Sequence, residues 1–271
     1  MRNIFYLSMI ITTKIYGYIQ CPLRTLVIHA HPNPSSFSRV LFNTVVKGLH
    51  EQNADIRVRS LYYYGDNSEE CYNGKTFQPV LSQKDLILYN NLNQPPNIDS
   101  VINTIKTNLQ SGFRRNPTTA SSFKIRNNLD TRSTEDFDND ISEAIQDLRW
   151  CTSLVFVYPT WWYSMPAILK GYFDRVMIPG VAFNYDQKNQ YRIVPGLTHI
   201  NKIGIVTTYG APMHIVAMNG DLGRKLITNG LSPHCAVQCQ IIHKGLYNMD
   251  HTTDSHRSVF LSDILNTYTN F

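Results

Sequence analysis

Five short apolar runs rich in β-branched residues recur along the chain, and stretches of helical periodicity separate or follow them. Such runs are typical of buried strands, whereas apolar residues three and four positions apart indicate amphipathic helices. Strands are predicted at residues 25–30, 55–61, 153–158, 202–208 and 236–242. Helices are predicted at residues 40–49, 141–150, 165–178, 220–229 (or starting nearer Met213) and 252–268. This alternation predicts an α/β fold with one doubly wound, five-stranded parallel sheet.

Two segments fall outside this pattern, and both are predicted to lie outside the core. Residues 1–22 are interpreted as an N-terminal extension or a start placed too early; a short signal sequence is the alternative, but no small-residue cleavage site follows the apolar run. Residues 23–271 are predicted to form a single domain that carries a polar, flexible insert at about 106–138.

Short helices are expected at 79–91 and 98–109. Ser164 is placed to cap the helix at 165–178, with Pro166 in its first turn.

Charge and cysteine content exclude several classes of protein. The 271 residues carry a net charge of +5, but residues 1–21 contribute +2 and residues 106–135 contribute +4, so the remainder is close to neutral. No basic face for nucleic acid is therefore expected. No apolar run reaches the length of a membrane-spanning segment. Five scattered cysteines without a C-x-x-C pair indicate neither a disulfide framework nor a metal site, and a cytoplasmic protein is expected.

Ligands of doubly wound sheets bind at the carboxyl ends of the strands, which selects the loops at 31–38, 159–164 and 208–214. The first loop opens a helix, whose N-terminus favours an anion. It has no glycine, but Ser35, Ser36 and Ser38 offer hydroxyl donors and His31 stands at the strand end. These residues predict a phosphate loop; a plain helix cap by Ser35 or Ser36 is the alternative.

The other two loops supply an aromatic wall and hydrogen-bond donors. Pro159 is followed by Thr160, and then come three aromatic residues, Trp161, Trp162 and Tyr163. Such a cluster usually packs in a core, but its place at the ligand edge favours a platform for a planar ring. The third loop has donors at Thr207 and Thr208 and a glycine, Gly210, where the backbone can approach a ligand. Together the three loops predict a flavin pocket.

Four segments of the sequence, in this order and spacing, resemble those of a known family: 25–38 (TLVIHAHPNPSSFS), 158–176 (YPTWWYSMPAILKGYFDRV), 179–183 (PGVAF) and 207–211 (TTYGA). Together they resemble the flavodoxin-like NAD(P)H:quinone oxidoreductases, and most of all their bacterial NAD(P)H-dependent branch. The resemblance implies a flavodoxin-like fold, FAD or else FMN as cofactor, and a homodimer in which residues 179–183 help to form the partner's pocket. It also implies that two electrons pass from NAD(P)H to a quinone-like acceptor by ping-pong exchange at one site.

Individual roles follow from the same resemblance. His31, Phe37 and Ser38 match the positions that contact the cofactor's phosphates. Residues 160–163 and 207–210, Tyr209 included, match those that contact the flavin ring from its two sides. The chain departs from eukaryotic members after this loop: His214 and Asn219 stand near the places of a Tyr and a His, with shorter spacing.

Tyr209 and His214 are accordingly the candidate catalytic residues, with Tyr209 also expected to narrow access for the acceptor. Two other functions stay open at this point: a non-enzymatic electron carrier of the flavodoxin type, and a flavin-binding regulatory subunit of a transporter. Carriers of that type are commonly acidic, whereas this chain is nearly neutral outside its insert.

Overall fold

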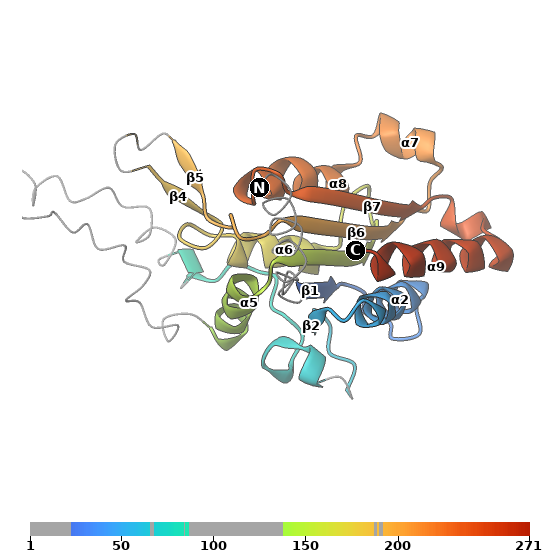
Figure 1. Ribbon diagram of the computed structural model, residues 1–271, viewed down its shortest axis with the longest axis horizontal. Coiled ribbons are helices and arrows are strands. Elements are labelled where there is room, and N and C mark those ends of the chain that lie inside the picture. The colour runs from blue at the N-terminus through green and yellow to red at the C-terminus, as the bar shows by residue number, and fades with distance from the viewer. Residues whose placement is uncertain (1–22, 66–67, 84, 87–137, 187–188, 190–191) are drawn as a thin grey trace, which may run out of the picture.

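The computed structural model describes residues 23–65, 68–83, 85–86, 138–186, 189 and 192–271. Its main sheet has five parallel strands in the order β2-β1-β3-β6-β7 (Figure 1). The strands are β1 (Arg24–His29), β2 (Asp55–Ser60), β3 (Ser153–Pro159), β6 (Lys202–Thr208) and β7 (Gln240–Leu246). The strand order reverses between β1 and β3, which is the point where such sheets open a crevice for ligands. The predicted fold class is confirmed.

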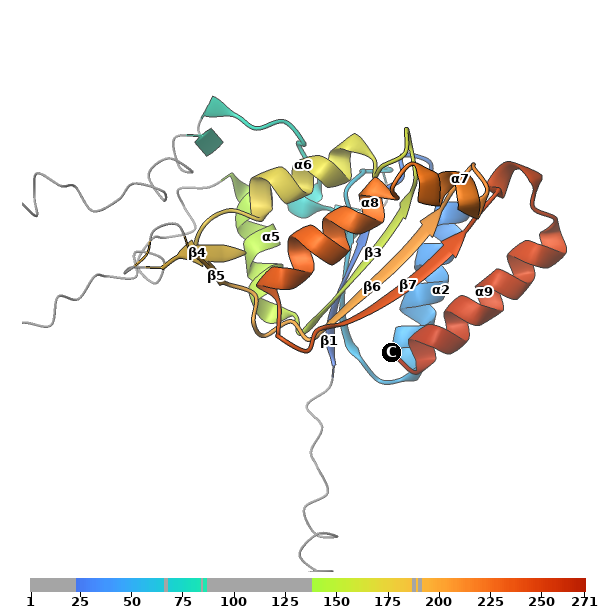
Figure 2. The ribbon, with the colours of Figure 1, turned by 90° about the horizontal axis from the view of Figure 1, so that it is seen from above.

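Helices cover both faces of the sheet (Figure 2). One face packs against α2 (Phe37–Glu51) and α9 (Asp254–Thr269), and the other against α5 (Asn139–Trp150), α6 (Ala167–Val176) and the helical segment 222–231. Alternate residues of β3 divide between the layers: Val155 and Val157 face α2 and α9, whereas Leu154 and Phe156 face α5 and α6. Strands buried on both faces explain why their sequences are continuous apolar runs.

Shorter elements connect these layers. They are the 3₁₀ turns Ser68–Glu70, Tyr72–Gly74, Ser232–His234 and Met249–His251, the helices α7 (Met213–Met218) and α8 (Leu222–Lys225), a π-helical turn at Leu226–Leu231, and the antiparallel pair β4 (Phe183–Tyr185) and β5 (Ile193–Pro195). The sequence patterns did not predict the β4–β5 pair, whose strands have only three residues each.

Two predicted elements were wrong in their bounds. The fifth strand begins at Gln240 rather than at residue 236, because residues 236–239 form a turn in which the Cys239 amide donates to the Ala236 carbonyl at 2.9 Å. The helix predicted at 220–229 corresponds to the helical segment 222–231, but the alternative start near Met213 was wrong: Asp221 has a left-handed backbone (φ 48°) and separates α7 from α8. A residue with a left-handed backbone cannot continue a right-handed helix.

The predicted cap of α6 was also wrong. Ser164 is paired through its backbone with Trp161, and Pro166 is the residue that precedes the first helical position, Ala167. The helix expected at 98–109, nearly all of the insert and the extension at 1–22 lie outside the described residues, as do residue 84 and residues 87–91 of the helix expected at 79–91. Within the described part of the chain, no helix has the length and apolar character that crossing a membrane requires. The four cysteines there, Cys71, Cys151, Cys235 and Cys239, are free thiols.

Candidate functional site

The three loops selected from the sequence meet at the carboxyl edge of the sheet. The rings of His31 and Trp161 lie 5.7 Å apart, which joins the first loop to the second. The hydroxyl oxygens of Thr160 and Thr207 are 3.3 Å apart, and the Thr160 amide donates to the Thr208 carbonyl at 2.8 Å. Pro159 has no amide proton to donate to the neighbouring strand. The hydrogen bond from the next amide, that of Thr160, therefore holds the second and third loops together just beyond the end of β3.

The second loop is a two-residue hairpin with its aromatic side chains on the outside. Trp161 and Ser164 exchange both backbone hydrogen bonds, at 2.9 and 3.1 Å, around Trp162 and Tyr163. These two residues have φ values of 48° and 62°, as a turn with two left-handed central residues requires. Trp162 is 92% exposed and Tyr163 46%. The cluster therefore does not pack in the core.

The hairpin also changes which amides can serve a ligand. The amides of Thr160 and Trp161 are already bound to backbone carbonyls. The amides of Trp162 and Tyr163, at the turn itself, are the two that the hairpin's backbone pairs do not use.

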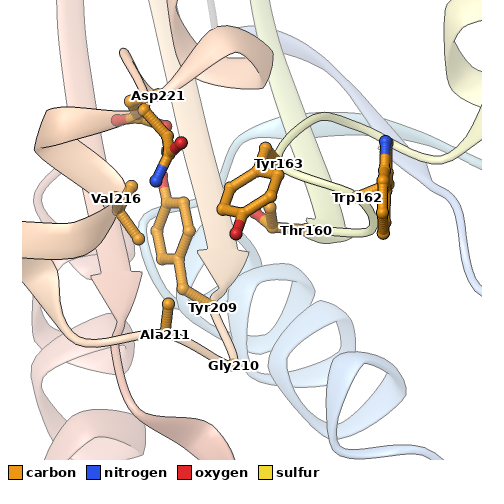
Figure 3. Close-up of a pocket in the computed structure, with 9 residues that line it drawn as sticks. Thr160, Trp162, Tyr163, Tyr209, Gly210, Ala211, Val216 and Asp221 are labelled. Carbon is orange, nitrogen blue, oxygen red and sulfur yellow. Dashed lines mark hydrogen bonds between the residues drawn. The ribbon is translucent and has the colours of Figure 1, made fainter.

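A pocket of about 280 Å³ lies between this hairpin and the third loop (Figure 3). Nine residues line it: Thr160, Trp162, Tyr163, Tyr209, Gly210, Ala211, Val216, Asn219 and Asp221. The Tyr163 ring faces Tyr209 across the opening, and Asp221 lies beyond the hydroxyl end of Tyr209. His214 is exposed in the first turn of α7 and is not one of these lining residues.

Tyr209 is the buried wall of this pocket. It is 1% exposed and its ring stacks on that of Tyr247, with 4.6 Å between centroids and 3° between planes. Its hydroxyl donates to Asp221 Oδ1 at 2.9 Å and lies 3.2 Å from His243 Nε2. Burial and the Asp221 charge raise the pKa of Tyr209 well above its ordinary value. At neutral pH the phenol is therefore protonated and its proton is directed at a carboxylate.

In the first loop Ser36 is the helix cap, since its hydroxyl accepts from the Arg39 amide at 3.2 Å. Ser35 is exposed at the rim and Phe37 is half-buried. The amides of Phe37 and Ser38 are the first two of α2, so neither has an acceptor within the helix. The sequence predicted an anion site here, and the donors that the structure offers for one are backbone amides as much as serine hydroxyls.

The Ser38 hydroxyl faces inward, toward a buried histidine that sequence analysis missed. Ser38 Oγ is 3.2 Å from His29 Nε2, and the Tyr64 hydroxyl is 3.4 Å from His29 Nδ1. Burial, and next the charges of Arg39 and His31, lower the pKa of His29 to about 3. Burial also lowers the pKa of His31, against a backbone hydrogen bond with Asn33 that raises it. Both imidazoles are therefore neutral at pH 7.

Comparison with a family model described as "Flavodoxin-like fold" gives a match over residues 23–226, about three quarters of the chain. The chain belongs to this family. The resemblance stated from the sequence is thereby confirmed at the level of the fold family, and the matched region contains all three loops at the carboxyl edge of the sheet.

Individual proteins are similar to this flavodoxin-like chain in sequence or in structure. The human ribosyldihydronicotinamide dehydrogenase [quinone] is 26% identical over 161 residues, which are 59% of this chain and 54% of that protein. The chain spans about half the length of the curated relatives it matches. Among solved structures, the NAD(P)H:quinone oxidoreductase from Methanothermobacter marburgensis has a TM-score of 0.61 at 19% identity, covering 92% of this chain and 97% of that one.

An FMN-dependent NADH-azoreductase from Bacillus anthracis, solved in complex with FMN, has a TM-score of 0.57 at 17% identity. The match covers 92% of this chain and 98% of that one. At such identities the likeness to both solved structures shows the fold that they share with this chain.

Sequence analysis of this flavodoxin-like chain missed the pocket residues Val216 and Asp221, and it named Asn219 without placing it in the pocket. They lie at the end of α7 and in the turn that follows it, inside the stretch where the helix boundary was misplaced. The dipeptide Asn219-Gly220 before Asp221 is a turn signal that could have placed this break.

Proposed function

We propose that this flavodoxin-like protein binds a flavin in the pocket between residues 160–163 and 209–211, and passes two electrons from NAD(P)H to quinone-like acceptors. The observation that carries the proposal is the pair of exposed aromatic residues Trp162 and Tyr163, which line the pocket together with Tyr209. Large aromatic side chains left exposed beside a pocket are typical of a binding surface for a planar ring.

The residues present fit such a group at both ends. Between the hairpin and the third loop, a flat ring would meet Tyr163 on one side and Gly210 on the other, with the amides of Trp162 and Tyr163 as donors. A phosphate would meet the amides of Phe37 and Ser38 at the start of α2. We further propose that His31, Ser35 and the hydroxyls of Thr160, Thr207 and Thr208 border these two regions.

A bound flavin would supply the redox chemistry itself, by accepting a hydride from NAD(P)H and passing the electrons on. The protein's part is to orient the ring and to exclude water from one of its faces. Tyr209 would close the inner wall of the pocket, and the exposed rim at Trp162 would leave room for NAD(P)H and the acceptor to bind in turn. His214, exposed on α7, stays a prediction as a proton donor at the rim.

The names of the relatives support this reaction class, since one is a quinone dehydrogenase and a structural neighbour is an NADH-azoreductase. FAD was the first expectation from the sequence, whereas FMN occupies that neighbour. We also propose a homodimer, supported by apolar side chains of β4 and β5 that are exposed in one chain (Tyr185, Ile193 and Val194). A reducing compartment is supported by the free thiols of the described cysteines.

The test is a visible absorption spectrum of the purified protein, with chromatography of the released flavin to distinguish FAD from FMN. We expect a flavin spectrum, oxidation of NAD(P)H only with an acceptor present, and parallel double-reciprocal lines. Tyr163→Ala should weaken flavin binding about fivefold, since stacking on an aromatic ring contributes about 1 kcal/mol. Tyr63→Ala, which removes an exposed tyrosine outside the pocket lining, is the matched control.

A protein that stays colourless after incubation with both flavins would contradict the proposal. Flavin binding without NAD(P)H oxidation would indicate an electron carrier or a regulatory subunit instead. Intersecting kinetic lines would exclude exchange of the two substrates at one site.

A further inference from the structure

Asp221 is a buried carboxylate that capping of α8 does not explain. It directly precedes α8, where an aspartate commonly accepts a hydrogen bond from the first turn, yet its side chain makes no cap bond. It is 7% exposed and holds a left-handed backbone, φ 48°. Strained backbone that persists beside a pocket is a reason to look for a function.

The carboxylate is directed toward the pocket wall. Asp221 Oδ1 accepts from the Tyr209 hydroxyl at 2.9 Å, and Oδ2 accepts from Arg224 Nε. A phenol has one proton and an ionised carboxylate can only accept, so this proton belongs to the bond with Asp221. His243 Nε2, 3.2 Å from the phenol oxygen, must then be the donor to Tyr209. The hydrogen bonds run in one direction, from His243 through Tyr209 to Asp221.

A glycine in β7, Gly245, leaves room for the Tyr209 ring. A Cβ atom at Gly245 would lie 2.9 Å from Tyr209 Cε2 and 3.1 Å from His243 Cε1, so this strand position accepts no side chain while Tyr209 is in place. Tyr247 then stacks on the same ring. The Tyr209 ring is thus held from the side by packing and at its hydroxyl end by Asp221.

We propose that Asp221 is a positioning residue of the pocket: it fixes Tyr209 as a rigid inner wall and thereby sets the size of acceptor that the pocket admits. The inference about acceptors rests on the proposed function. Tyr209 acts here as a wall rather than as a proton donor, since its only proton is held by Asp221. Removing the carboxylate frees the hydroxyl end of the ring, so the pocket loses its discrimination between small and large acceptors.

The groups that face the carboxylate agree with this role. The Asp221 charge contributes, after burial, to raising the pKa values of Tyr209, Tyr158 and Tyr247. The pKa of His243 is lowered by burial and by Arg224, and Asp221 opposes that lowering. The hydrogen bond to Asp221 raises the pKa of Arg224. The charge of Asp221 thus acts on the groups around the Tyr209 hydroxyl, second to burial in the case of the tyrosines.

The experiment compares Asp221→Ala, Asp221→Asn, Tyr209→Phe and the double variant Asp221→Ala/Tyr209→Phe. Asp254→Ala is the matched control, because Asp254 pairs with Arg257 at the same i, i+3 spacing but its side chain is 99% exposed. The kcat and KM values are measured with 1,4-benzoquinone and with a three-ring anthraquinone. An activity-independent readout is the His243 pKa by NMR in the flavin-free protein.

We expect Asp221→Ala and Tyr209→Phe each to reduce the ratio of kcat/KM between the two quinones by about fivefold, mainly through KM. The double variant should be no worse than either single one, since both remove the same contact. Asp221→Asn keeps an acceptor for the phenol and should retain the ratio, while the His243 pKa falls because a charge that raised it is gone. Asp254→Ala should change neither quantity.

Unchanged discrimination in folded Asp221→Ala, or additive effects of the two single variants, would overturn the proposal. If Asp221→Ala does not fold, Tyr209→Phe and Asp221→Asn decide it in the same way. If the wild-type protein reduces no quinone, the proposed function fails, and the His243 pKa then decides the hydrogen-bond chain from His243 through Tyr209 to Asp221, on which the fixed wall depends. A His243 pKa that does not move in Asp221→Asn would overturn that chain as well.

Discussion

Trp162 and Tyr163 hold backbone conformations that aromatic residues rarely adopt, with φ values of 48° and 62°. Each such residue costs about 1–3 kcal/mol, and the cost is usually found at functional sites. Trp162 recovers little of it through packing, because it is 92% exposed. Its side chain is therefore better explained by a ligand that stacks on it than by the stability of the free protein.

This trade-off predicts the effect of Trp162→Gly. Glycine adopts a positive φ without strain, so we expect the unfolding free energy of the flavin-free protein to rise by about 1 kcal/mol in urea denaturation. Flavin affinity, measured by fluorescence titration, should fall about tenfold because the stacking surface is lost. In the control variant Asn73→Gly, at another positive φ (51°) outside the pocket lining, flavin affinity should stay the same. A Trp162→Gly protein that is less stable and binds flavin normally would refute the interpretation.

At the scale of elements, periodicity was enough to predict where the sheet and its helices lie, but not every boundary. Residues 202–208 formed a strand as predicted because all but the first are buried, which the apolar run reports directly. The fifth strand was displaced because the apolar residues Ala236 and Val237 belong to a turn, and Val237 is fully exposed. A local apolar pattern cannot tell which of its members finds a neighbouring strand.

The candidate site, too, was predictable from the sequence only in part. The rule that ligands bind at the carboxyl ends of strands was enough to bring the three loops together. The burial of Tyr209 could not be read from its own loop, because it depends on the space left by Gly245 on another strand and on the carboxylate of Asp221. His29 was equally hidden: its partners Ser38 and Tyr64 come from two other segments.

One element is anchored by a buried cation. Arg175 on α6 is 2% exposed and forms ion pairs with Asp85 at 3.0 Å, Asp138 at 3.0 Å and Asp140 at 3.2 Å. It also donates to the Gln78 carbonyl at 2.7 Å. The guanidinium thus joins the residues around 78–85 to the start of α5.

We expect Arg175→Met to lower the unfolding free energy by about 3–5 kcal/mol, because carboxylates are left without their cation in a partly buried place. Lys170→Met is the control on the same helix: its ion pair with Asp174 is exposed, and its loss should change stability by less than about 1 kcal/mol. Urea denaturation of both variants checks this. Equal effects of the two substitutions would mean that the buried cluster contributes no more than a surface pair.

At the scale of the whole molecule, His29 links folding to pH. It lies at the end of strand β1, is 0% exposed, and has a pKa lowered from 6.5 to about 3. Above pH 6.5 the imidazole is neutral in both the folded and the unfolded chain, so its contribution to stability does not change. Between pH 6.5 and about 3 the unfolded chain takes up a proton that the folded chain refuses.

Stability should therefore fall as the pH is lowered through this window, and His29 alone accounts for a slope of about 1.4 kcal/mol per pH unit. We expect His29→Gln, which cannot titrate, to reduce the slope of unfolding free energy against pH by about that amount between pH 6 and 4. The other histidines with lowered pKa values (His31, His234 and His243) contribute to both proteins and cancel in the difference. His256→Gln, at an exposed position of α9, should leave the slope unchanged. Urea denaturation at half-unit pH intervals measures it, and equal slopes in His29→Gln and the wild type would mean that His29 is protonated in the folded protein.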